Sequence, residues 1–88
     1  MLTKQQAHNL AWGFAQKGAA HRPYPLRSPA VNASFGSDST GKEILGCEHD
    51  FWSFIFEMDV PPDVVIAPDV VIVLVDPQTG KTGYFPVM

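Results

Sequence analysis

The alternation of apolar and polar positions is clearest between residues 51 and 58. Large apolar side chains at every second position, Trp52, Phe54, Phe56 and Met58, alternate with Ser53, Ile55 and Glu57. A spacing of two is typical of a β-strand that buries one face. We therefore predict a strand over 51–58 that anchors the core.

The first residues follow a helical period instead. At 100° per residue, one stripe carries the apolar side chains of Ala7, Leu10, Ala11 and Phe14. Thr3 followed three residues later by Gln6 predicts a capping box at the start of the helix, and Gly18 predicts its end. On this wheel Trp12 projects to nearly the opposite side from the stripe, beside His8.

Shorter segments complete the expected sheet. Residues 19–30 contain three prolines and are predicted to form an extended connector. A first strand is expected at 30–35, a polar turn at 36–41 and a second strand at 43–47.

The sequence Pro-Asp-Val-Val-Ile occurs twice, at 62–66 and at 68–72. Because proline lacks the amide hydrogen of a sheet ladder, Pro68 argues against one continuous strand. We assign the strand to the second copy and expect the first copy to be irregular or at an edge.

Residues 70–75 are all apolar, which is typical of a strand with both faces covered. A turn at 76–81, with Gly80 in the left-handed conformation, is expected to lead into a last strand at 82–85. One helix covers one face only, so we expect the connector or a second copy of the chain on the other face. The second option predicts a homodimer that forms through the sheet.

These elements predict an α+β fold, in which one N-terminal helix packs on a four- to five-stranded antiparallel sheet. The 88 residues form a single domain of helix (1–18), connector (19–30) and sheet (31–88). A chain of this size buries about 63% of its unfolded surface, which is enough for independent folding.

Charge is divided unevenly along the chain, although the net charge is only −3. Residues 1–37 carry a charge of +4 and residues 38–88 a charge of −7. The acidic part either lies against the basic part or forms a face for a basic partner, for which Glu57 and Asp59 are candidate contacts. The sequence has no basic patch with interleaved aromatic residues, so it gives no indication of nucleic-acid binding.

A single cysteine excludes an internal disulfide framework. The sequence shows neither a signal peptide nor an apolar run long enough to span a membrane. We therefore expect a cytoplasmic protein without membrane association.

Two segments bear on chemistry. Gly36–Lys42 matches part of a phosphate-binding loop, but Glu43 replaces the required Ser or Thr, so we interpret the segment as a turn. In a strand, the side chains of Cys47 and His49 would lie about 7 Å apart, too far for direct contact. We therefore expect a small buried thiol at the end of a strand, with no catalytic residue, no metal site and no cofactor.

Trp12 and His8 are the best aromatic candidates for a partner contact, since large aromatic residues carry much of the energy at interfaces. The alternative is that residues 24–26 fold back and cover the indole. Both interpretations stay open at this point.

Three segments resemble a known family. They are the helix opening Leu-Thr-Lys-Gln-Gln-Ala, the strand Phe-Trp-Ser-Phe-Ile-Phe and the ending Val71-Ile-Val-Leu-Val-Asp-Pro-Gln-Thr-Gly-Lys81. Together they resemble the small YrhB-type bacterial domains grouped with polymorphic-toxin immunity proteins. The resemblance implies stoichiometric binding of a toxin or client protein, with no catalytic residue. A similar terminal hairpin in cystatin-like and peptidase-associated domains would imply inhibition.

The sequence thus favours a non-enzymatic protein-binding module, immunity-like or inhibitor-like, that neutralises a basic partner by covering its surface. A small enzyme or ligand-binding domain that uses Cys47 and His49 is the alternative. A subunit that only dimerises is a third.

Overall fold

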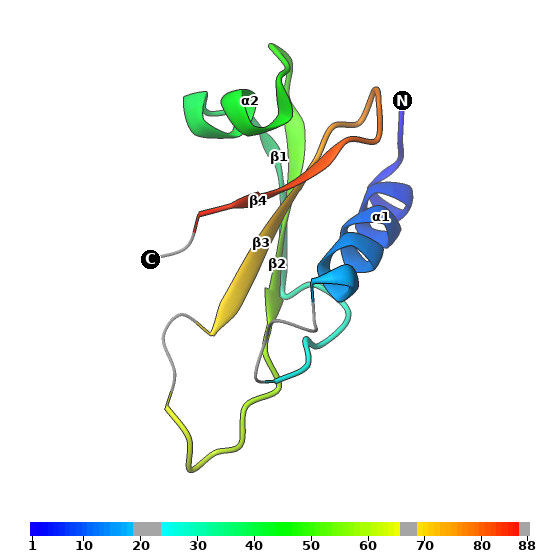
Figure 1. Ribbon diagram of the computed structural model, residues 1–88. Helices are drawn as coiled ribbons and strands as arrows, with labels where there is room; N and C mark the ends of the chain where they lie inside the picture. The colour runs from blue at the N-terminus through cyan, green and yellow to red at the C-terminus, as the bar shows by residue number, and fades with distance from the viewer. Residues whose placement is uncertain (19–23, 66–68, 87–88) are drawn as a thin grey trace.

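A computed structural model describes residues 1–18, 24–65 and 69–86. Its elements follow in the order α1 (Lys4–Lys17), β1 (Asn32–Gly36), α2 (Ser39–Leu45), β2 (Phe51–Glu57), β3 (Val70–Val75) and β4 (Thr82–Phe85). The four strands form one antiparallel sheet in the order β1-β2-β3-β4 (Figure 1). The predicted α+β fold is therefore confirmed, with a second helix added.

Helix α1 has the ends that the sequence predicts. The Thr3 side chain accepts a hydrogen bond from the Gln6 amide, the Gln6 side chain accepts one from the Thr3 amide, and Gly18 is the C-cap. Its buried residues are Ala7, Ala11 and Ala15. The expected stripe is wrong at Leu10, which is 42% exposed. A row of alanines lets the helix lie close to the large aromatic side chains of the sheet.

Helix α2 occupies the segment for which we expected a polar turn and a strand, so that prediction is wrong. Asp38 caps the helix, because its carboxylate accepts a hydrogen bond from the Gly41 amide at 2.6 Å. Gly46 ends it in the left-handed conformation, with φ at 67°. These two end signals outweigh the strand preference of Ile44, which lies between them.

The two helices lie on opposite faces of the sheet (Figure 1). On one face, the α1 alanines meet buried residues of the two central strands: Phe54, Phe56, Val71, Val73 and Val75. On the other face, Leu45 and Cys47 pack with Phe51 and Leu74. Helix α2 thus covers one end of the second face, which explains much of the unbroken apolar character of β3.

The two copies of the repeated pentapeptide differ as predicted. Val70–Val75, which includes most of the second copy, pairs with β2, whereas Val64 and Val65 lie outside any strand. Ile66 and Pro68 lie outside the described residues.

The turn between β3 and β4 also confirms its prediction, since Gly80 has a φ of 77°. The Gly80 amide donates to the Asp76 carbonyl and the Asp76 amide donates to the Lys81 carbonyl, both at 2.8 Å. Among the described residues, no helix is long and apolar enough to cross a membrane.

Candidate functional site

Glu57 and Asp59 lie where β2 ends and the chain leaves the sheet. The Asp59 carboxylate forms an ion pair with Arg27 at 2.9 Å, and both side chains are more than half exposed. Backbone hydrogen bonds fix the same contact, because Arg27 donates to the Glu57 carbonyl and Asp59 donates to the Pro25 carbonyl, both at 2.7 Å. The described part of the connector is therefore tied to the end of β2.

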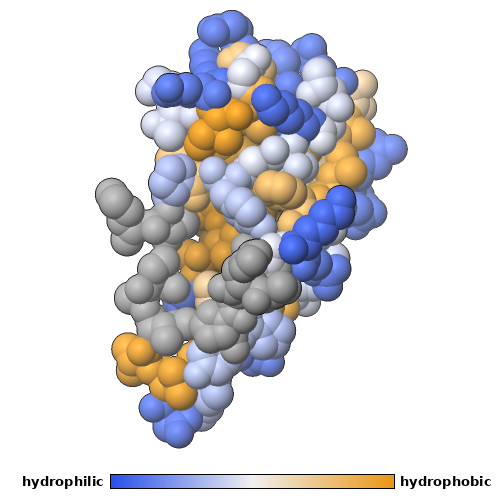
Figure 2. Space-filling model, in the orientation of Figure 1, coloured by the Kyte–Doolittle hydropathy of each residue, from blue (hydrophilic) through white to orange (hydrophobic). Residues whose placement is uncertain are grey.

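Beyond Asp59 the chain forms a projecting segment that we call the acidic loop, comprising residues 57–65 and Asp69. Its apolar tip is open to solvent, with Val65 94% exposed and Pro61 and Pro62 also exposed. Figure 2 shows apolar atoms at this end of the molecule next to hydrophilic ones.

The acidic loop carries four acidic side chains: Glu57, Asp59, Asp63 and Asp69. Arg27 is the one cation beside them in the described chain, and it is already paired with Asp59. Arg27, Glu57, Val65 and Asp69 line an open groove of about 290 Å³. The acidic loop therefore combines exposed apolar surface with an excess of negative charge.

Trp12 and His8 lie on the packed side of α1, not on the opposite side as the helical wheel predicts. The Trp12 ring contacts Phe56, with ring centroids 5.4 Å apart. His8 contacts Phe54 edge-on, and its Nε2 accepts a hydrogen bond from the Ala30 amide at 3.0 Å. Both are half-buried, and neither belongs to the acidic loop. The four predicted contact residues thus occupy two separate places.

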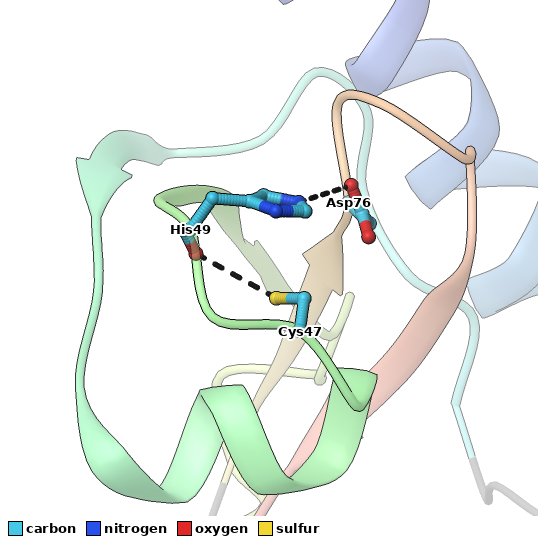
Figure 3. A group of neighbouring side chains, drawn as sticks. All are labelled: Cys47, His49 and Asp76. Atoms are coloured by element: carbon cyan, nitrogen blue, oxygen red, sulfur yellow. Dashed lines mark hydrogen bonds and ion pairs between the residues drawn. The ribbon is translucent and has the colours of Figure 1, made fainter.

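Cys47 and His49 lie in the loop between α2 and β2, not in a strand, so the predicted separation along a strand does not apply. The Cys47 thiol is buried, at 8% exposure, and donates to the His49 carbonyl at 3.6 Å. His49 Nε2 lies 2.7 Å from Asp76 Oδ1 (Figure 3). The fold therefore adds to this pair a carboxylate from the end of β3.

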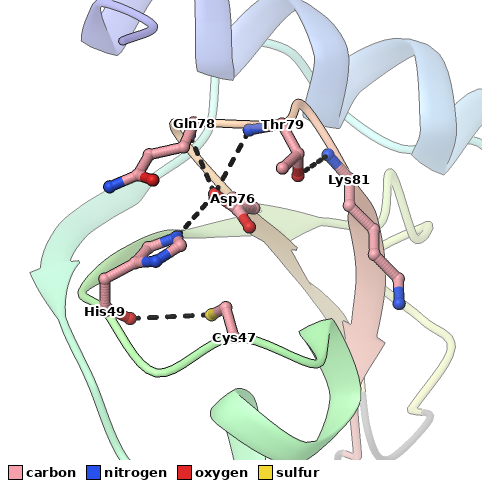
Figure 4. Close-up of polar contacts among 6 residues, drawn as sticks. All are labelled: Cys47, His49, Asp76, Gln78, Thr79 and Lys81. Carbon is pink, nitrogen blue, oxygen red and sulfur yellow. Dashed lines mark hydrogen bonds and ion pairs between the residues drawn. The ribbon is translucent and has the colours of Figure 1, made fainter.

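Asp76 is held from several directions. Its Oδ1 accepts hydrogen bonds from the Gln78 amide at 2.8 Å and the Thr79 amide at 3.4 Å, in addition to the contact with His49 (Figure 4). Burial raises the pKa of this carboxyl, but the hydrogen bonds from His49, Gln78 and Thr79 together outweigh it and hold the pKa below its ordinary value. Asp76 is therefore a buried carboxylate, only 3% exposed.

Sequence reasoning missed Asp76 because the contact depends on strand register. The pairing of Trp52 with Val75 places residue 76 beside the start of β2, next to the loop that holds His49. The predicted strands could have revealed the contact, since pairing of 51–58 with 70–75 in this register brings residue 76 next to the loop that holds His49.

No protein-family model, curated protein or solved structure matches this chain.

Proposed function

We propose that this protein is a non-enzymatic binding module that neutralises a basic protein partner by covering part of its surface with the acidic loop. The exposed Val65, which lines the same groove as Glu57 and Asp69, carries the proposal. A partner can bury the exposed apolar side chain on binding, while the negative charge of the loop favours partners with a basic surface.

The apolar part of the loop supplies affinity. Burying apolar surface gains about 25 cal/mol per Å², so a partner that covers Val65 and its neighbouring prolines gains free energy without any rearrangement of the sheet. Prolines at positions 61 and 62 also restrict the free loop, which lowers the entropy lost on binding.

The acidic part supplies selectivity and speed. Facing opposite charges raise the association rate, and like charges on a wrong partner oppose contact. Because Arg27 already binds Asp59, the carboxylates of Glu57, Asp63 and Asp69 are the ones we assign to cations of the partner. Binding of this kind weakens as salt rises.

A capture experiment tests the proposal. The full chain, with a photo-crosslinker at position 65, is exposed to a lysate of its own cells, and the linked protein is identified and purified for affinity measurement. We expect a basic partner whose affinity falls at least tenfold for the variant Asp63→Asn with Asp69→Asn, and falls with added salt.

The matched control is Glu43→Gln with Glu48→Gln. It removes the same charge from two exposed residues at the α2 end, and we expect it to leave the affinity unchanged. Equal losses in both variants would contradict a specific role for the acidic loop. Recovery of no partner, together with a measured thiol-dependent activity, would support the enzymatic alternative instead.

We further propose that two copies meet through the part of the second sheet face that α2 leaves open. An apolar groove of about 190 Å³ lies there, lined in part by Ile55, Ile72 and Phe85. All three side chains are only half-buried in one chain. Sedimentation velocity should show a dimer, and a monomer at micromolar and higher concentrations would contradict this contact.

An immunity-like role in the cytoplasm agrees with both proposals. The single cysteine is reduced in that compartment, and immunity proteins of the YrhB type, which the sequence resembles, act by stoichiometric binding. A toxin gene beside the gene for this protein would support the role, whereas a metabolic operon would favour the alternative.

A further inference from the structure

The loop between α2 and β2 and the end of β3 bring together three side chains of different chemistry. One ligand atom from each of Cys47, His49 and Asp76 lies within 4.8 Å of the other two. Figure 3 shows the three side chains pointing toward one another from two separate segments. Their donors are one sulfur, one nitrogen and one oxygen.

We propose that Cys47, His49 and Asp76 form a binding site for a divalent transition-metal ion of the zinc type. This departs from the sequence-based expectation of no metal site, because Asp76 adds a third ligand that sequence spacing did not reveal. The site lies at the end of the sheet opposite the acidic loop, so it goes beyond the proposed binding function (Figure 1).

The donor set selects the class of metal. Thiolate and imidazole bind zinc and its neighbours well, whereas magnesium and calcium require mainly oxygen ligands. Three protein ligands leave the fourth tetrahedral position to a water molecule. His49 is one-third exposed at its side chain, which provides solvent access to that position.

The distances need only a small adjustment. Zinc bonds of about 2.0–2.3 Å place neighbouring tetrahedral ligands about 3.3–3.8 Å apart. The contact of 2.7 Å between His49 Nε2 and Asp76 Oδ1 therefore has to open slightly, and the widest separation has to close by about 1 Å. Cys47 and His49 belong to one short connecting loop, so a shift of that loop moves two of the ligands together.

Asp76 can serve the metal without giving up its place in the hairpin. Its Oδ1 accepts hydrogen bonds from the amides of the β3–β4 turn, and the carboxylate has a second oxygen, Oδ2, that can bind an ion. A ligand that is already fixed by its surroundings loses little freedom when metal binds. In Figure 4 the Lys81 side chain lies outside the group of three ligands, and its Nζ is 3.6 Å from where a Cβ on Gly46 would be.

Charge balance favours an ion at this place. Metal binding displaces the thiol proton of Cys47 to solvent, and Nε2 of His49 can bind the ion only after the proton that it donates to Asp76 has left that nitrogen. The resulting thiolate and the Asp76 carboxylate together carry two negative charges, which a divalent cation cancels. A neutral cluster costs much less to bury than separate charges do.

Cobalt(II) is the probe of choice, because it replaces zinc and reports thiolate coordination through its charge-transfer absorption. The reduced, untagged, full-length protein is titrated with Co²⁺ and then with Zn²⁺. We expect one equivalent of Co²⁺ to produce the sulfur-to-cobalt band, Zn²⁺ to abolish it, and excess Mg²⁺ to leave it unchanged.

Variants locate the site. Cys47→Ser should abolish the band, and His49→Gln should weaken Co²⁺ binding at least tenfold. His8→Gln is the control, because His8 lies against the opposite sheet face and should bind no metal. Absence of the band in the wild-type protein, or equal binding by Cys47→Ser, would overturn the proposal.

A measurement on the wild-type protein covers the case in which the variants fail to fold. Zn²⁺ should slow alkylation of Cys47 at least tenfold and raise the melting temperature, whereas Mg²⁺ should do neither. Alkylation at the same rate with and without Zn²⁺ would refute metal binding by the thiol.

Discussion

Replacement of Asp76 by asparagine tests the hydrogen-bonded carboxylate at the centre of the β3–β4 turn. Asparagine keeps an acceptor oxygen for the Gln78 and Thr79 amides but removes the negative charge next to His49. Hydrogen bonds to a charged group contribute about 1.5–3 kcal/mol each, against about 1 kcal/mol for neutral ones. We therefore expect Asp76→Asn to lower the free energy of unfolding by about 2 kcal/mol near pH 7.

The pH dependence identifies the charge as the cause. The pKa of Asp76 is lower in the folded protein than its ordinary value of 3.8. A carboxyl of this kind stabilises the fold fully above its unfolded pKa, and the contribution disappears as pH falls through the folded pKa. The difference between wild type and Asp76→Asn should thus be constant from pH 7 to about pH 5 and shrink at lower pH.

Urea unfolding at several pH values, followed by circular dichroism with a chelator present, measures this difference. For a domain of this size the slope is about 1 kcal/mol per M, so the wild-type midpoint should exceed that of the variant by about 2 M near pH 7. The control is Asp63→Asn, an exposed residue whose replacement should change the midpoint little at any pH. A difference for Asp76→Asn that is equally large at pH 3 would refute the argument from charge.

Three further substitutions should change stability in different directions, as urea or thermal unfolding would show. Gly41→Ala should cost more than about 2 kcal/mol, because the added methyl group would collide with the Phe51 ring, and an unchanged midpoint would mean that this ring is not fixed. Gly13→Ala should stabilise the protein by up to about 1 kcal/mol, since nothing lies near the added group inside α1, and a loss would reveal an unseen contact. Trp12→Ala should cost about 3 kcal/mol through its lost packing on Phe56, whereas a negligible cost would favour a role for the indole in partner binding.

Local signals explain most of what the sequence predicted correctly. The capping box at Thr3, the alternation in 51–58 and the turn that ends at Gly80 each specify their structure within a few residues. Helix α2 was missed because its seven residues are too short for a clear helical period, while Ile44 favours a strand. Asp38 and Gly46 are typical residues for the two ends of a helix, but we assigned Asp38 to a polar turn and Gly46 to a strand.

The contact between His49 and Asp76 illustrates the opposite case. Twenty-seven residues separate the two side chains, and only the pairing of β2 with β3 brings them together. The placement of Trp12 is also a tertiary effect, because the alanine row turns the helix so that Phe56 reaches the indole. Both contacts depend on strand register or on the rotation of a helix about its axis, which the pattern of single residues does not specify.

The two proposed sites lie at opposite ends of the central strands and should act independently. Trp52 pairs with Val75 at one end and Glu57 pairs with Val70 at the other, so about 17 Å of strand separates the ends. The free-energy effects of two substitutions this far apart usually add to within about 0.5 kcal/mol when the residues share no contacts. Cys47→Ser should therefore leave partner affinity unchanged, and the asparagine pair at positions 63 and 69 should leave Co²⁺ affinity unchanged. Because coupling between binding sites is reciprocal, a change of tenfold or more in both measurements would show that the sheet transmits binding from one end to the other.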